Sequence, residues 1–502
     1  MATVSNELTR QLSIAKYNVK ANLLFGHLLL GGLIVAIKSQ PVLLLVLIIC
    51  IGAFAVTRRY NDLIIVGIYS LCAISDVNYY CFSILSLAIL PFLHHKIPAS
   101  FSPIKRIFLF FLLFLIFLYL LQMFTNGSVL SLPLFVITFL SPFTIIFLIA
   151  KIPENKLSIP YILNHLLAIA ISQAVIAFVF QALPLGISTI LGRATYGDRL
   201  QGSTGSAPNL SVLLLVAVLP FFLNMFEVKL SKTKRLFTIT TVIFFIGMII
   251  LNDAKTYLYA FVFSYVVLIF MKRYMLYQTL PKIVFTISFV LLLLILLSRS
   301  IFSFLGYTAD KYAEYITGRY NSKALYYQYT FDPATRPLYQ YLLGTGPGTN
   351  GSRASNALAY DVMYKKENSV KLPGFIPPAS SPFTKRYLSK LYTVDYAESS
   401  GGRSALLGNP FNSICAIFIE FGVVGFLLYM FLIFKILQQL YLKKNALSLS
   451  AMLAICAILI VSFFDQTLEQ PMPAHLMFTL AGLCLRTTTP NKLSVLGIKR
   501  HN

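Results

Sequence analysis

The chain has 502 residues, of which 57% are hydrophobic and only 12% are charged. A soluble domain could not bury that much apolar surface, because soluble proteins are nearer half apolar and a quarter charged; a soluble protein is therefore excluded. The formal net charge is +24, but the basic residues occur in short clusters between apolar runs. This pattern is typical of the cytoplasmic loops of membrane proteins, and it argues against a nucleic-acid partner.

Apolar runs follow one another along the chain at lengths that approach a bilayer crossing. The sequence predicts an all-α, polytopic membrane fold of about fourteen transmembrane helices, since about 20 apolar residues cross a bilayer. The predicted spans are residues 20–37, 41–56, 62–75, 80–93, 104–123, 128–150, 160–187, 210–226, 236–251, 256–271, 283–305, 411–434, 449–464 and 472–486. No convincing cleavage site follows the first run, so we expect an uncleaved first helix rather than a signal peptide.

Alternate loops between these spans carry the basic residues. Examples are Arg58-Arg59, Lys105-Arg106, Lys272-Arg273 and Lys443-Lys444, whereas the short loops on the other side carry few. Because cytoplasmic loops are enriched in Lys and Arg, this alternation predicts that both termini are cytoplasmic.

Two outer segments are longer than the other loops. Residues 188–209 form a polar, Gly-rich loop, and residues 306–410 form a segment of about a hundred residues. A structureless loop of that length is unusual, so we expect a mainly helical extracytoplasmic domain. The predicted organisation is therefore membrane helices in 1–305, the loop domain in 306–410, membrane helices in 411–486 and a cytoplasmic tail in 487–502.

The predicted outer loops contain no His and no metal-binding motif, so we expect neither a catalytic metal nor another cofactor. The stretch from Gly346 to Gly351 satisfies the letters of a dinucleotide-binding motif. It follows no predicted strand and opens no clear helix, so we do not interpret it as a nucleotide site.

Cationic residues on the predicted outer side are the best candidates for a site that binds a phosphate group. The guanidinium of Arg grips phosphate oxygens with two parallel hydrogen bonds, and Lys adds a compact charge. Arg199, Arg319 and Lys255 lie in three separate outer loops. Together they could hold a lipid-linked pyrophosphate and stabilise it as a leaving group. The alternative is that each reaches up to lipid headgroups without a catalytic role.

Four short segments on the outer side resemble the O-antigen ligase and O-antigen polymerase family of bacterial membrane glycosyltransferases. They are Arg199-Leu-Gln-Gly202 with Pro208-Asn209, Ala254-Lys255-Thr256, Gly318-Arg319 with Leu343-Gly-Thr-Gly-Pro-Gly348, and Asn412 followed by Gly422-Val-Val-Gly425. The ligases of this family place a His before that Asn, whereas this chain has Phe411. Since Phe cannot accept a proton, the resemblance favours a polymerase over a ligase.

The resemblance implies a metal-independent transfer at the outer face of the bacterial inner membrane. A polyprenyl-diphosphate-linked glycan would be moved onto the next lipid-linked repeat unit. The implied catalytic residues are Arg199, Arg319 and Glu420, and the implied substrate-binding residues are Arg193, Lys255, Arg403, Asn412 and Tyr320. The implied partners are the lipid-linked donor and acceptor, membrane lipid, and a flippase and a chain-length regulator.

The sequence does not decide which residue would act as the base that takes the proton from the acceptor hydroxyl. Glu420, Asp198, Asp253 and Glu398 could each serve, and Glu420 could instead be a structural, hydrogen-bonded carboxylate within its span. Sugar rings could pack on tyrosines of the loop domain: Tyr320, Tyr326, Tyr327, Tyr329, Tyr360, Tyr364, Tyr387 and Tyr392.

Two other functions are compatible with the sequence. One is an O-antigen ligase that transfers glycan to lipid A core. The other is a transporter of anions or lipid-linked sugars, which should carry ionisable groups near the middle of the bilayer. Most predicted spans lack such groups, and Glu420 is the main exception.

Overall fold

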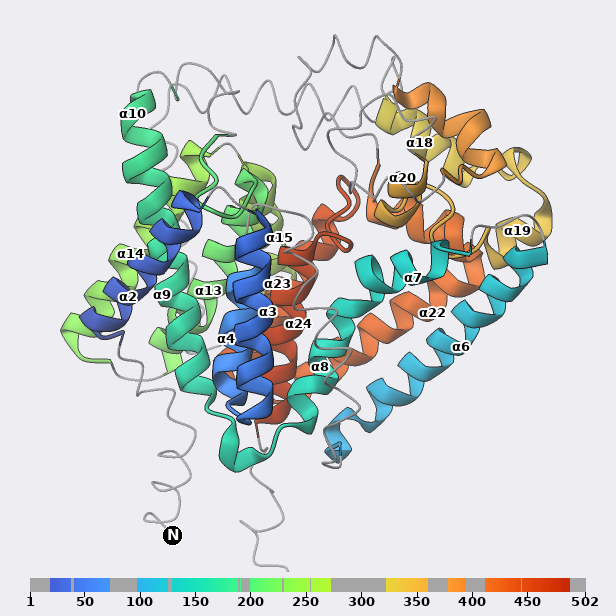
Figure 1. Cartoon of the computed structure of the whole chain (residues 1–502). Coiled ribbons are helices and arrows are strands. Elements are labelled where there is room, and N and C mark those ends of the chain that lie inside the picture. Colours follow the sequence, from blue (N-terminus) through green and yellow to red (C-terminus); the bar gives the residue numbers. More distant parts are fainter. Residues whose placement is uncertain are drawn as a thin grey trace, which may run out of the picture.

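The computed structural model of the chain (Figure 1) is all-helical over the part that it describes. The described residues are 19–37, 40–72, 97–124, 129–187, 190, 199–227, 230–252, 254–271, 322–359, 378–392, 411–443 and 445–487. The predicted spans at 80–93 and 283–305 lie outside these ranges.

The longer helices run back and forth between two ends of the molecule. They are α2 (Ala21–Ala36), α3 (Gln40–Val56), α4 (Tyr60–Leu71), α6 (Ser102–Phe124), α8 (Ser141–Lys151), α9 (Ile159–Ile176), α13 (Ala207–Glu227), α14 (Lys232–Leu251), α15 (Lys255–Met271), α22 (Ser413–Lys443), α23 (Ala446–Val461) and α24 (Pro471–Arg486). Short elements extend or cap them: η3 (Ala99–Phe101), α7 (Ser131–Phe135), η4 (Val136–Leu140), η5 (Glu154–Lys156), η6 (Ala177–Ala182) and α10 (Leu183–Leu185).

Six helical stretches among the described residues are long and apolar enough to cross a membrane. They are Ala99–Met123, Ser131–Lys151, Glu154–Leu185, Ala207–Met225, Lys232–Leu251 and Ser413–Lys443. They coincide with six predicted spans, which confirms a multi-pass, all-helical membrane protein. The other described apolar helices are shorter, so the count of fourteen stays a prediction.

The six stretches differ in how deeply they are buried. Within its apolar window the stretch from Ala207 is 78% buried, whereas those from Ala99 and Lys232 are 22% and 28% buried. The last two stretches expose large apolar side chains, among them Phe110 and Ile243. Such surface is expected to face lipid, because lipid tails are as apolar as these side chains.

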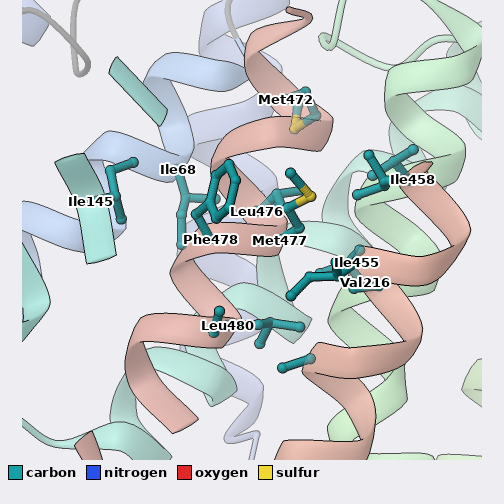
Figure 2. Close-up of a cluster of buried hydrophobic side chains, with 14 of the residues drawn as sticks. Ile68, Ile145, Val216, Ile455, Ile458, Met472, Leu476, Met477, Phe478 and Leu480 are labelled. Atoms are coloured by element: carbon teal, nitrogen blue, oxygen red, sulfur yellow. The ribbon is translucent and has the colours of Figure 1, made fainter. Parts of the chain in front are cut away.

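Helix α24 lies at the centre of the core and contacts α4, α8, α13, α22 and α23. Figure 2 shows Phe478 of this helix on the side of Ile68 (α4) and Ile145 (α8), and Met477 on the side of Ile455 and Ile458 (α23). Every residue of α24 from Pro471 to Leu485 is buried, as expected for a helix that is surrounded by other helices.

The two ends of the helical bundle differ in charge. Among the described residues, one end, called the basic end here, carries the basic clusters: Arg58, Arg59, Lys105, Arg106, Lys151, Lys156, Lys232, Lys234, Arg235, Lys443 and Arg486. Hydrogen bonds tie the helix termini together there. Arg486 Nη2 donates to Ile152 O at 2.6 Å, and Ser158 N donates to Asn61 Oδ1 at 2.9 Å.

The opposite end carries the loops and short helices that the sequence assigns to the outer side. These helices are α18 (Ser322–Phe331), η7 (Pro333–Thr335), α19 (Leu338–Leu343), α20 (Arg353–Leu358), η8 (Thr384–Leu388) and η9 (Ser389–Tyr392). Figure 1 shows α18 and α20 above the upper end of α22 and α19 beside it. Two loops at this end are named for the site below: the arginine loop (residues 199–206) and the glycine loop (residues 344–351).

Candidate functional site

The glycine loop lies against a kink in α22. The helix is interrupted at Gly422, whose φ of 63° and ψ of −171° are not helical. A break in the helical ladder opens the carbonyls just before it to other donors. Thr345 N donates to Ile419 O and Gly346 N donates to Glu420 O, both at 3.0 Å. Backbone hydrogen bonds therefore hold the loop against α22, and they do not depend on the side chains of the loop.

Two glycines allow this contact. A Cβ on Gly344 would lie 2.2 Å from Glu420 O, and one on Gly422 would lie 2.4 Å from Leu342 O. Both glycines have positive φ, 94° and 63°, a region that L-residues rarely adopt. The spaced glycines that resemble the family motif thus have a steric reason, which is the close approach of two backbones.

Glu420 holds the same loop through its side chain. Its Oε2 accepts a hydrogen bond from Gly348 N at 2.8 Å, and its Oε1 accepts one from Asn350 N at 2.9 Å. The residue is only 1% exposed. Because both oxygens face backbone donors and are shielded from solvent, the geometry favours the structural alternative for this carboxylate.

Asn412 caps the helix that carries the kink. Its Oδ1 accepts from Cys415 N at 2.8 Å, as expected of Asn before a helix N-terminus. Its Nδ2 is buried and has no hydrogen-bond partner within the described ranges. Phe411 is fully buried, with its ring edge-on to Tyr326 at a centroid distance of 5.1 Å. The side chain in the family's His position therefore packs in an apolar cluster.

Glutamine side chains from α9 and η6 hold the arginine loop. Gln181 Oε1 accepts from Gln201 N at 2.8 Å and from Gly202 N at 2.9 Å. Gln173 Oε1 accepts from Ser203 N at 2.8 Å. The backbone N–H groups of the loop, which have no helical hydrogen bonds, thus donate to glutamine side chains instead.

The start of α15 is tied to the end of the same loop. Asn252 Nδ2 donates to Ala207 O at 3.1 Å and to Ser211 Oγ at 2.9 Å, while its Oδ1 accepts from Ala254 N at 3.2 Å. One amide therefore joins the turn before Lys255 to the first turn of α13. Two of the four family-like segments meet at this point.

The turn between α23 and α24, residues 462–470, joins the other two segments. Its Asp465 O accepts from Ser413 N at 3.1 Å, at the start of α22. Its Gln466 Nε2 donates to Gly351 O at 2.6 Å, at the end of the glycine loop. The turn is thus packed between the glycine loop and the capped end of α22.

The same turn reaches toward the arginine-loop half of the molecule. Asp465 interacts electrostatically with Tyr257, which lies two residues after Lys255 in α15. Helix α15 also packs along α23, which leads into the turn. The turn therefore connects the two pairs of segments at one end of the bundle.

A buried lysine and a buried acid meet at this turn. Lys323 Nζ donates to Phe464 O, and the Asp465 carboxylate accepts from Gln466 N and Gln470 Nε2, both at 2.8 Å. Burial lowers the pKa of Lys323 to about 8, and the charge of Asp465 opposes that shift. Burial also raises the pKa of Asp465.

A second acid of the turn, Glu469, holds the start of α20. Its Oε2 accepts a hydrogen bond from Arg353 N. Burial raises the pKa of Glu469 to about 8, and the nearby Glu420 carboxylate adds to the rise.

Sequence reasoning missed Asp465, Glu469 and Lys323. The available signal was the placing of two acids in one short turn, in a chain with only 17 Asp and Glu.

Arg336 is a further cation that sequence reasoning missed. It is 6% exposed, and its Nη2 donates to Thr330 O at 2.7 Å. The guanidinium carbon lies 5.1 Å from the centroid of the Tyr341 ring and 5.6 Å from that of Phe418. Its Nε and Nη1 have no hydrogen-bond partner in the part of the chain that is described. Two unused donors on a buried cation suit an anionic ligand.

The structure describes only some of the predicted site residues. Arg199 is exposed at the start of the arginine loop, and the backbone of Lys255 opens α15. Four predicted residues lie outside the described ranges: Arg193, Arg319, Tyr320 and Arg403. The alternative bases Asp198, Asp253 and Glu398 also lie outside them.

The described tyrosines of the loop domain are mainly packing residues. Tyr326 is fully buried, and Tyr327, Tyr329 and Tyr387 pack around the same apolar cluster. The side chain of Tyr392 and all of Tyr320, Tyr360 and Tyr364 lie outside the described part. Among the described residues there is also no group of three or more His, Cys, Asp or Glu that could hold a metal ion.

A chain of titratable side chains joins α2, α4 and α9, away from the outer site. His27 Nδ1 is hydrogen-bonded to Tyr69 Oη, and His27 Nε2 to His165 Nδ1 at 2.9 Å. The Tyr161 ring lies tilted against His165 with ring centroids 4.3 Å apart, and its hydroxyl donates to Asp62 Oδ1 at 3.0 Å. Most predicted spans lack ionisable groups, and this helix group is a further exception beside Glu420.

No model of a known protein family matches the chain, and no curated protein matches it at a significant level. The resemblance to the O-antigen ligase and polymerase family therefore rests on the short segments alone.

Proposed function

We propose that the protein is a membrane glycosyltransferase that polymerises polyprenyl-diphosphate-linked saccharide repeat units. The observation that carries this proposal is the convergence of the family-like segments. Segments far apart in sequence, at 199–211, 252–255, 344–351 and 411–422, are joined by hydrogen bonds and by the 462–470 turn. The loops of a scaffold are where binding and catalytic residues gather.

Cations at this end supply the chemistry that the proposal needs. Arg199 and Arg319 would hold the diphosphate, with support from Lys255, and the resemblance is the basis for these roles. Arg336 adds a buried guanidinium with two unused donors beside α22. Charge-assisted contacts of this kind stabilise the departing diphosphate more than the bound donor, because the diphosphate gains negative charge as the bond from the sugar carbon to its oxygen breaks. The other end of the bundle, with its basic clusters, would then face the cytoplasm.

Phe411 supports the polymerase over the ligase. A buried phenyl ring in an apolar cluster cannot take a proton from an acceptor hydroxyl. Glu420 faces two backbone amides rather than an open site, and its role in the proposed reaction is to position the glycine loop. The product would be an O-antigen or exopolysaccharide chain.

The test is polymerisation of a purified polyprenyl-diphosphate repeat unit by the detergent-solubilised protein. We expect a ladder of products without any added acceptor. Arg199→Ala, Arg319→Ala and Arg336→Met should each lower the rate at least about tenfold, the loss expected for one charge-assisted contact. Arg106→Ala, an exposed arginine at the basic end, is the matched control and should leave the rate unchanged.

Two other results would decide against the proposal. Transfer only after addition of a lipid A–core acceptor would make the protein a ligase despite Phe411. The absence of transfer with any lipid-linked donor, from protein that unfolds cooperatively, would exclude both enzymes.

A transporter is the second candidate, and the Tyr69–His27–His165 chain favours it. Hydrogen-bonded ionisable groups among apolar helices are common in proton-coupled transporters. The test is substrate-driven proton uptake in proteoliposomes, with His27→Gln beside the native protein. Uptake that is lost in this variant, together with an absence of polymerisation, would favour transport.

A further inference from the structure

A cavity of about 220 Å³ opens between α13 and α14 at the basic end of the bundle. Its apolar wall includes Phe221 and Leu230, and its polar wall includes Asn224, Thr233 and Lys234. A concave, mainly apolar site with a few converging polar groups is the usual form of a small-molecule pocket. The site lies at the opposite end of the helices from the family-like segments.

A buried amide in this cavity has an unused donor. Asn224 is 1% exposed, and its Nδ2 has no hydrogen-bond partner within the described ranges. Buried polar groups without partners are rare, because losing water without a replacement hydrogen bond costs about 1–3 kcal/mol. A ligand oxygen in the cavity would satisfy this donor.

The residues at the start of α14 indicate that the ligand is negatively charged. Lys232, Lys234 and Arg235 occupy its first turn, and that turn contains no acid. The N-terminus of a helix already carries a partial positive charge, so three added cations oppose the helix dipole. An anion bound there would relieve the repulsion and accept hydrogen bonds from the helix end.

We propose that this cavity binds the phosphate of an anionic phospholipid headgroup. Asn224 Nδ2 and Lys234 Nζ contact the phosphate oxygens, and the upper part of an acyl chain lies along Phe221 and Phe237. The apolar wall and the membrane-crossing length of both helices favour a lipid over a soluble phosphate. Basic pockets between transmembrane helices commonly take such headgroups on the cytoplasmic side.

Native mass spectrometry of the delipidated full chain in detergent micelles tests the proposal. Phosphatidylglycerol should bind the native protein with a one-to-one component that phosphatidylcholine lacks. Asn224→Leu, which keeps the branched shape of the side chain but removes its donor, and Lys234→Gln should each weaken that component about tenfold, the effect of one lost hydrogen bond to a charged group. Lys105→Gln, an exposed lysine at the same end, is the matched control and should bind as the native protein does.

Three results would overturn the proposal. The first is equal binding of the two lipids, and the second is equal loss of binding in the control and the cavity variants. The third is displacement of the lipid by inorganic phosphate, which would identify a soluble anion as the ligand. The unfolding temperature of each variant without lipid shows whether it is folded. Lys234 is only half-buried, so Lys234→Gln keeps the test usable if Asn224→Leu does not fold.

Discussion

At the scale of single residues, Glu420 shows why an acid within an apolar run is ambiguous in sequence. In the sequence, Glu420 stands alone among apolar residues, which makes it a candidate base for the acceptor hydroxyl. In the structure, its carboxylate accepts hydrogen bonds from two backbone amides, which is the geometry of a residue that anchors the glycine loop. A carboxylate can take either role, and only the position of its neighbours separates them.

Glu420→Gln separates these roles experimentally. The amide keeps one acceptor but turns an NH₂ group toward a backbone N–H, so we expect a loss of about 1–3 kcal/mol in the free energy of unfolding. Polymerase activity should fall together with stability, as thermal unfolding and product ladders would show. An inactive variant with an unchanged unfolding temperature would instead assign the proton transfer to Glu420.

Glu469 predicts a pH dependence of stability. Its pKa is raised in the folded protein to about 8 from an ordinary value of 4.5. Between these two values the folded state binds more protons than the unfolded state, so this residue's contribution to stability is complete at low pH and is lost as the pH rises toward 8. We expect the unfolding temperature of the native protein to fall across that window.

The matched variant is Glu469→Gln, which removes the titrating group but keeps an acceptor for Arg353 N. Its unfolding temperature should fall less between pH 5 and pH 8 than that of the native protein. Parallel curves for the two proteins would show that other groups, such as Asp465, set the dependence.

At the scale of elements, the kink of α22 decides whether the loop domain can dock. Gly422 permits both the break in the helix and the approach of the backbone at Leu342. A continuous helix would keep its carbonyls within its own ladder and leave the glycine loop without partners.

Gly422→Ala should therefore destabilise the protein by about 2–3 kcal/mol, from the strained φ and the clash together. Gly247→Ala is the control, since Gly247 lies within α14 and its Cβ would meet no atom within 4 Å. That change should be neutral or slightly stabilising, because Ala favours a helix over Gly by up to about 1 kcal/mol. Similar unfolding temperatures for the two variants would contradict the docking role of the kink.

At the scale of the whole molecule, the two ends differ in charge and in the elements that they carry. If the basic end faces the cytoplasm, an impermeant maleimide should label Ala334→Cys in intact cells. It should label Thr57→Cys only after the membrane is opened. Both positions are exposed, and they lie at opposite ends of the bundle. The reverse pattern would invert the predicted topology and remove the outer site.

Much of the architecture could be predicted from local composition. The helices at 99–123, 131–151, 154–185, 207–225, 232–251 and 413–443 overlap predicted spans, although the last one continues to Lys443, well beyond the predicted end at 434. Apolar length is a property of each segment alone, so it needs no knowledge of partners. The glycine positions at 344, 346, 348 and 422 were also visible, although their steric reason was not.

The sequence by itself determined that the protein is an all-helical, multi-pass membrane protein with its basic residues gathered on alternate loops. Only the tertiary structure decided which carboxylates hold loops, that Arg336 is buried with unused donors, and that His27 meets His165. These properties depend on side chains that are far apart in the chain but share one local environment. Burial and hydrogen bonding are set by that environment, and residue type alone does not specify it.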